Sequence, residues 1–168
     1  MTATRSAGGG TGDGPLLRLF TDGAARGNPG PAGAGLVIED ASGRRLWGGC
    51  RYLGVATNNQ AEYRALIAGL RKVAEWAPRR LEVYLDSELV VRQLDGRYRV
   101  KSADLRPLHV QATALLRAFP EVTVTHVPRE RNRGADALAN RAIDEHVPSP
   151  DALEGATSDD GVRGEASG

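Results

Sequence analysis

The fold of this chain is indicated most strongly by residues 16–33. In this stretch a short apolar run is followed by an acid and then by a glycine-rich segment. The apolar run has the length of a buried strand, and the glycines and prolines that follow are typical of a turn. A strand fixes the position of an acid at its end, and a permissive loop lets a ligand approach that acid. Asp22 is therefore a candidate for chemistry, although the dipeptide Asp22-Gly23 taken alone favours a hairpin turn.

The bulk composition predicts one domain in a reducing compartment. The chain has 168 residues and an apolar content of 40%, which is enough for one sizeable core. It contains no apolar run of about 20 residues, and its start lacks the apolar segment of a signal peptide, so we expect a soluble, cytoplasmic protein without a membrane partner. A single cysteine, Cys50, excludes an intrachain disulfide and favours a small core residue over a nucleophile.

The net charge of +1 hides an asymmetry along the chain. Of the 22 bases and 21 acids, one base and seven acids lie after Ile143, so the preceding body holds 21 bases and 14 acids. A basic body suits a polyanionic partner. For residues 147–168 the composition favours a disordered, solubilising acidic tail over a regulatory one, and residues 1–14 are expected to form a disordered arm.

The residues between these ends, 15–146, follow strand and helix patterns in the order β-β-β-α-β-α-α-β-α. Three strands joined by short turns imply an antiparallel meander, and the later alternation implies strands connected through helices. We therefore predict an α/β domain with a five-stranded mixed sheet flanked by helices. The expected strands cover residues 16–20, 34–39, 45–52, 81–85 and 121–127. The first expected helix follows the capping residues 57–59 and ends before Pro78, and the others cover residues 87–94, 103–118 and 133–145.

Four acids stand out by their positions in these elements. Asp22 and Asp86 follow predicted strands, and Glu62 and Asp136 fall in the first turns of predicted helices. A right-handed crossover would bring the two strands together, so that Asp22 and Asp86 lie side by side. Adjacent carboxylates repel unless a cation lies between them, and hard divalent ions such as Mg²⁺ relieve that repulsion. For Glu62 alone, stabilisation by the helix dipole is a sufficient explanation.

Four motifs contain these acids. They are Thr21-Asp22-Gly23 with Gly27-Asn28-Pro29-Gly30-Pro31-Ala32-Gly33, then Thr57-Asn58-Asn59-Gln60-Ala61-Glu62, Asp86-Ser87, and Asn132-Arg133-Gly134-Ala135-Asp136. In this order, over about residues 16–145, they resemble the ribonuclease HI family, of the bacterial type that lacks the basic protrusion. The resemblance implies a ribonuclease H fold and a monomeric endonuclease that cleaves the RNA strand of RNA–DNA hybrids, leaving 5′-phosphate and 3′-hydroxyl ends.

The same resemblance implies roles for individual residues. Asp22, Glu62, Asp86 and Asp136 would be catalytic acids that bind two Mg²⁺ or Mn²⁺ ions in the substrate complex, as two-metal phosphodiester hydrolysis requires. The motif also assigns Asn28, Asn58 and Asn59 to the hybrid, with Thr57 near a phosphate of the DNA strand. Amide side chains can donate to and accept from a 2′-hydroxyl, the group that marks RNA. Their alternative roles are turn formation at Asn28 and helix capping at Thr57 or Asn58.

The chain departs from the family pattern near the predicted binding surface. Glu88 replaces the glutamine found in well-studied bacterial members, and a carboxylate there could accept from a 2′-hydroxyl but would repel phosphate. Their basic helix and loop is reduced to residues 97–101, so the hybrid is expected to bind more weakly or to depend on the cluster of Arg129, Arg131 and Arg133.

Other interpretations of the chain stay open at this stage. His126 stands near the family's mobile histidine, but a packed strand histidine is favoured over a catalytic one. A related nuclease, such as an integrase, a resolvase or the nuclease domain of a reverse transcriptase, is disfavoured by the intact motif at residues 57–62. The alternative from another class is a catalytically weak or inactive nucleic-acid-binding module with the same fold.

Overall fold

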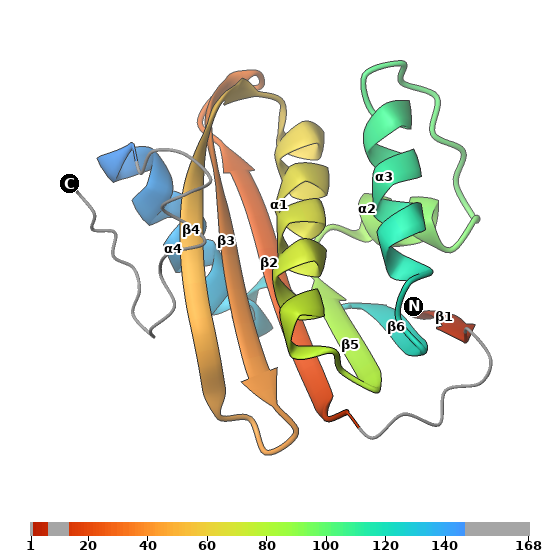
Figure 1. The fold of residues 1–168 in the computed structure, drawn as a ribbon. Helices are drawn as coiled ribbons and strands as arrows, with labels where there is room; N and C mark the ends of the chain where they lie inside the picture. Colours follow the sequence, from red (N-terminus) through yellow and green to blue (C-terminus); the bar gives the residue numbers. More distant parts are fainter. Residues whose placement is uncertain (1, 7–13, 147–168) are drawn as a thin grey trace.

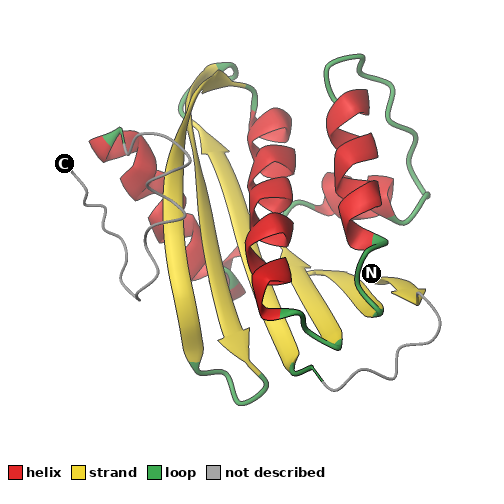
Figure 2. Ribbon diagram, in the orientation of Figure 1, coloured by secondary structure: helices red, strands yellow, loops and turns green. Residues whose placement is uncertain are grey.

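The structure, a computed structural model, describes residues 2–6 and 14–146 (Figure 1). Strands and helices follow one another in it largely as the sequence predicts (Figure 2). The strands are β1 (Thr2–Ser6), β2 (Leu16–Ala25), β3 (Gly30–Asp40), β4 (Arg45–Ala56), β5 (Arg80–Leu85) and β6 (Glu121–His126). The helices are α1 (Asn58–Val73), α2 (Glu88–Leu94), α3 (Arg106–Leu116) and α4 (Arg133–Glu145), with short 3-10 turns at Ala74–Trp76 and Arg129–Arg131.

The six strands form one mixed sheet in the order β1-β6-β5-β2-β3-β4. β2, β3 and β4 make the predicted antiparallel meander. β5 runs parallel to both β2 and β6, so the chain crosses over through α1 as the sequence predicts. The five predicted strands and their mixed pairing are confirmed, and the end of β5 lies beside β2.

The strand β1 corrects the prediction of a disordered arm over residues 1–14. Residues 2–6 pair with β6 in antiparallel register, with Thr4 opposite Thr123, and add a sixth strand at the edge of the sheet. No apolar alternation marks this segment in the sequence, and none is needed, because an edge strand can be held by backbone hydrogen bonds to its neighbour. The remaining residues of the predicted arm, 1 and 7–13, and the predicted acidic tail, 147–168, lie outside the described residues.

Helices cover the two faces of the sheet differently (Figure 1). α1 packs across β2 and β3 on one face, with α3 against it, whereas α4 packs across β3, β2 and β4 on the other face. The larger apolar core, which includes Leu19 and Leu66, lies beneath α1. A smaller cluster, which includes Val37, Cys50 and Leu138, lies beneath α4, so Cys50 is the core residue that the sequence predicts.

The start of α1 is fixed by a capping box. The Thr57 hydroxyl accepts a hydrogen bond from the backbone N–H of Gln60 at 3.1 Å, and the Gln60 side chain accepts one from the backbone N–H of Thr57 at 2.9 Å. The reciprocal pair satisfies two N–H groups that a helix start otherwise leaves without partners. The predicted capping role of Thr57 is therefore confirmed. Across the two described ranges, no helix combines the length and apolarity needed to cross a membrane.

Candidate active site

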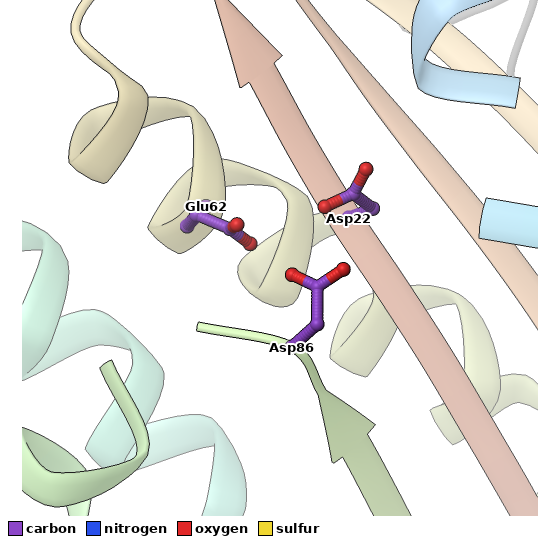
Figure 3. A group of neighbouring side chains, drawn as sticks. All are labelled: Asp22, Glu62 and Asp86. Atoms are coloured by element: carbon purple, nitrogen blue, oxygen red, sulfur yellow. The ribbon is translucent and has the colours of Figure 1, made fainter. Parts of the chain in front are cut away.

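Three of the four predicted acids converge at the junction of β2, α1 and β5. Asp22 comes from β2, Glu62 from α1 and Asp86 from the residue after β5, and their side chains point toward one another (Figure 3). Each offers a carboxylate oxygen, and these oxygens lie within 4.8 Å of one another. Residues that are 24 or more positions apart in the sequence therefore form one cluster, hereafter the acid cluster.

Asp22 lies inside β2 and not in a turn after it. The strand continues to Ala25, and Asp22 pairs with Gly35 of β3, so Asp22-Gly23 is not a hairpin turn. A Cβ atom on Gly23 would lie 2.1 Å from the backbone carbonyl carbon and oxygen of Ala61. Gly23 thus lets the first part of α1 lie directly on the strand, which brings Glu62 beside Asp22.

Glu62 is held by the same close contact. The backbone N–H of Gly23 donates to the Glu62 carboxylate at 3.3 Å. The expectation that Glu62 occupies the first helical turn is wrong, because α1 begins at Asn58 and its first turn contains no acid. Stabilisation by the helix dipole weakens beyond the first turn, so it does not explain an acid at this position.

Asp86 is positioned by the parallel pairing of β5 and by one buried amide. Asn132 is 1% exposed, and its side-chain nitrogen donates to the Thr21 carbonyl at 3.0 Å and to the Asp86 carboxylate at 3.4 Å. Asn132 immediately precedes α4 but makes no side-chain capping bond to that helix. Its amide instead joins β2 to the acid cluster.

Asp136 lies at the edge of the acid cluster. It occupies the first turn of α4, as the sequence predicts, and it is near enough to Asp22 to raise the pKa of that carboxyl. It is not among the three acids whose oxygens lie within 4.8 Å of one another. The structure therefore brings all four predicted acids into one region, with three of them in close contact.

Burial and mutual repulsion make ionisation of these acids costly. Burial raises the pKa of Asp22 to about 10, and the neighbouring carboxylates of Glu62, Asp86 and Asp136 add to the effect. Burial also raises the pKa of Glu62 to about 8, with the charge of Asp86 adding to it. The Gly23 N–H and the guanidinium of Arg129 oppose this second shift. The cluster therefore retains protons near neutral pH unless a cation replaces them.

The donor set of the acid cluster fits a hard divalent cation. Asp22, Glu62 and Asp86 offer oxygen atoms alone, which are the ligands that Mg²⁺ and Mn²⁺ prefer. A cation among the three carboxylates would balance the charges whose repulsion raises their pKa values. The arrangement can thus hold a divalent metal ion.

Comparisons with known proteins agree with this geometry. Residues 20–142 match a family model described as Reverse transcriptase-like. The chain is 46% identical over 132 residues to Ribonuclease HI of Halobacterium salinarum, which covers 79% of this chain and 66% of that protein. It is 41% identical to LC11-RNase H1, whose crystal structure contains an RNA/DNA hybrid, with a TM-score of 0.74 over 79% of this chain and 99% of that one. The chain belongs to the ribonuclease H family.

The family and fold predicted from the sequence are thereby confirmed. This ribonuclease H chain also matches a bifunctional protein of Mycobacterium tuberculosis, with 46% identity over 127 residues and 75% of this chain. It spans 66% of the length of the halobacterial relative and 35% of the mycobacterial one.

In this ribonuclease H chain, hydrogen bonds connect the start of α1 to the end of β2 and to the β2–β3 loop, where the predicted hybrid-binding residues Asn58 and Asn28 lie. The Asn58 side-chain oxygen accepts from the backbone N–H of Ala25 at 3.1 Å, and the Asn28 side-chain oxygen accepts from the backbone N–H of Asn58 at 3.0 Å. Both side chains are exposed, and within the described ranges their amide nitrogens make no hydrogen bond. The Asn28 and Asn58 amides therefore present donors to solvent from fixed positions.

The other predicted contacts lie on either side of this loop. Asn59 is half-buried and lines a hollow of about 580 Å³ together with residues of the basic connection 97–101. Glu88 is at the start of α2, with a side chain that is 52% exposed and paired with Arg92. The pairing offsets the negative charge that Glu88 would otherwise present to a phosphate.

The predicted pair Arg129 and Arg131 lies in the 3-10 turn between β6 and α4. The charge of Arg129 opposes the rise in the pKa of Glu62. Arg131 lines a cavity of about 120 Å³ that also contains Glu39 and Arg45. His126 lies at the end of β6, opposite Leu85, and is half-buried.

Sequence reasoning missed two asparagines near the acids. Asn132 was visible in its motif, but its place before a predicted helix is typical of a cap and gave no sign of a contact with Asp86. Asn140 lies four residues after Asp136 and donates to its backbone oxygen at 3.0 Å and to its carboxylate at 3.4 Å. Helical spacing alone could have indicated that second contact.

Proposed function

We propose that this protein is a metal-dependent endonuclease that hydrolyses the RNA strand of RNA–DNA hybrids. The observation that carries the proposal is the acid cluster, in which Asp22, Glu62 and Asp86 are gathered at a cost to the fold. A protein that only bound a polyanion would gain nothing from gathering like charges at its surface. The likeness to LC11-RNase H1, solved with an RNA/DNA hybrid, supports the choice of substrate.

The four acids would hold two Mg²⁺ or Mn²⁺ ions in the substrate complex. Such ions, when bound, activate water and stabilise the leaving oxygen, which is consistent with 5′-phosphate and 3′-hydroxyl products. The chain's own residues keep the acids in place for this task. Gly23 fixes Glu62 through its N–H, and Asn132 fixes Asp86 through its side-chain amide.

The residues at the start of α1 would select the RNA strand. Asn28 and Asn58 use their side-chain oxygens within the protein, so their amide N–H groups remain for a 2′-hydroxyl or a phosphate oxygen. The Thr57 hydroxyl accepts from the backbone N–H of Gln60 and keeps its own proton for a phosphate of the DNA strand. Asn59 and Glu88 would add contacts on the neighbouring surface, with Glu88 accepting from a 2′-hydroxyl.

Cleavage of a labelled 20-nucleotide RNA annealed to DNA tests the proposal directly. The RNA strand should be cut in Mg²⁺ or Mn²⁺ but not in EDTA, and single-stranded RNA and duplex DNA of the same sequence should stay intact. The products should accept 3′ ligation without prior phosphatase treatment, because their 3′ ends carry a hydroxyl. Tight binding of the hybrid with no cleavage in either metal would favour the inactive module instead.

A further inference from the structure

A chain of hydrogen bonds connects the β2–β3 loop to Asp136 across the surface of α4. Asp136, Asn140 and Asp144 are spaced four residues apart, so they lie along one face of that helix. The Arg26 guanidinium donates to the Asp144 carboxylate at 2.6 Å and to the Asn140 side-chain oxygen at 3.1 Å. The Asn140 side-chain nitrogen donates to the Asp136 carboxylate at 3.4 Å. One exposed arginine thus reaches a predicted catalytic acid through one intermediate amide.

Arg26 fixes the direction in which the Asn140 amide points. A guanidinium can only donate hydrogen bonds, so the Asn140 oxygen must face Arg26. The amide NH₂ group must then face Asp136, where it donates to the backbone oxygen at 3.0 Å as well as to the carboxylate. The opposite orientation would place two donors together at Arg26 and two acceptors together at Asp136, and both contacts would be repulsive.

This arrangement restrains the Asp136 side chain. The Asn140 side-chain nitrogen donates to one oxygen of its carboxylate and also to its backbone oxygen. A carboxylate that is fixed in this way keeps one rotamer, whereas a first-turn side chain on a helix is otherwise free to turn into solvent. Groups that hydrogen-bond to metal-binding carboxylates commonly change metal affinity or activity by about 10- to 100-fold when they are removed.

The loop that carries Arg26 also carries Asn28. Arg26 joins this loop to α4, and Asn28 joins it to the start of α1 through the backbone N–H of Asn58. Two residues between the ends of β2 and β3 therefore contact both helices that supply acids to the site. The loop offers a structural link between the surface predicted to bind the hybrid and the position of Asp136.

We propose that Asn140 is a positioning residue for Asp136 and that Arg26 acts through Asn140 by setting the direction of its amide. The expected effect of Asn140 on cleavage rests on the proposed function, whereas the expected effect of Asn140 on metal binding does not.

The test compares single and double variants in hybrid cleavage and in Mn²⁺ binding to the free protein by calorimetry. Asn140→Ala should lower kcat by about tenfold with KM within about twofold of wild type, and should weaken Mn²⁺ binding by about three- to tenfold. Asn140→Asp keeps the shape but faces Asp136 with a second carboxylate, so its losses should be at least as large. Arg26→Ala should lower kcat by about threefold, and the double variant Arg26→Ala/Asn140→Ala should be no worse than Asn140→Ala.

Arg141→Ala is the matched control, because Arg141 lies on α4 and pairs with Glu145, not with Arg26, Asn140 or Asp136. It should leave kcat and Mn²⁺ affinity unchanged, and circular dichroism should show every variant folded. Asn140→Ala and Asn140→Asp with wild-type kcat and Mn²⁺ affinity would overturn the proposal, as would losses that multiply in the double variant. A wild-type protein that binds Mn²⁺ but cleaves no hybrid would overturn the proposed function alone, and the Mn²⁺ affinities would still decide the role of Asn140.

Discussion

The acid cluster and the start of α1 lie next to each other but are built on opposite principles. At the cluster, buried carboxylates repel one another, and burial raises the pKa of Asp22 and of Glu62. At the start of α1, Thr57, Asn28 and Asn58 have hydrogen-bonded oxygens and stabilise the fold without any ligand. The acids therefore destabilise the fold when no cation is bound, whereas the binding residues have a structural role of their own. Substitutions should therefore change stability in opposite directions in the two regions.

The largest expected effect is the loss of cleavage on removing one charge from the acid cluster. Asp22→Asn should lower kcat on a hybrid by about 1,000-fold or more, which corresponds to about 4 kcal/mol, because an amide is a poor ligand for a hard divalent ion. Glu121→Gln is a matched control, since Glu121 begins β6 at the strand end opposite the site. Full activity of Asp22→Asn would contradict the assignment of the site.

Metal binding should stabilise the wild-type protein much more than the Asp22→Asn variant. A divalent ion that binds the folded chain at 100 times its dissociation constant adds about 2.7 kcal/mol, so saturating Mn²⁺ should raise the melting temperature by several degrees relative to EDTA. The increase should be much smaller in Asp22→Asn. Differential scanning calorimetry measures both, and equal increases in the two proteins would place the bound metal elsewhere.

At the start of α1, Thr57→Ala should weaken folding as well as binding. Loss of the capping hydroxyl should lower the free energy of unfolding by about 1 kcal/mol and raise the KM for the hybrid. Thr57→Ser keeps the hydroxyl and serves as the control in urea unfolding and in kinetics. A Thr57→Ala protein with unchanged stability would contradict the claim that the start of α1 stabilises the fold without a ligand.

The smallest expected effect is a difference in hybrid affinity between variants of Arg129 and Arg131. Arg129→Ala should weaken hybrid binding and reduce the slope of log affinity against log salt by about 0.7 to 0.9, as the loss of one phosphate contact does. Arg131→Ala should change both quantities less, because Arg131 lines a separate cavity with Glu39 and Arg45. Binding titrations at several salt concentrations with a catalytically inactive variant measure the difference, and equal slopes would argue against it.

The convergence of the acids could be predicted in part because Asp86 and Asp136 carry local signals. Asp86 follows an apolar strand, Asp136 lies in the first turn of a helix, and the parallel crossover brings Asp86 beside Asp22. The position of Asp22 within β2 could not be predicted, because an aspartate followed by a glycine is typical of a turn. The role of Gly23 depends on its contact with α1, which is a tertiary contact without a local signal in the sequence.

The contact between Asn132 and Asp86 also could not be predicted from the sequence. The two residues are 46 positions apart, and the Asn132 side chain could equally have faced solvent. The edge strand Thr2–Ser6 was missed because its pairing with β6 needs no apolar pattern. Periodicity detects burial, and these features depend on hydrogen bonds between distant segments.

The most direct test of the contrast is the pH dependence of folding for wild type and Asp22→Asn in EDTA. Asp22 has a pKa of about 10 in the folded protein and an ordinary pKa of 3.8 when it is exposed in the unfolded chain, so its contribution to stability is complete below about pH 4 and is lost as the pH rises toward 10. Urea unfolding should show Asp22→Asn more stable than wild type by about 2 kcal/mol at pH 7.5, with a smaller difference at pH 5. A variant that is equally stable or less stable than wild type at pH 7.5 would contradict the claim that the acid cluster is costly without its cation.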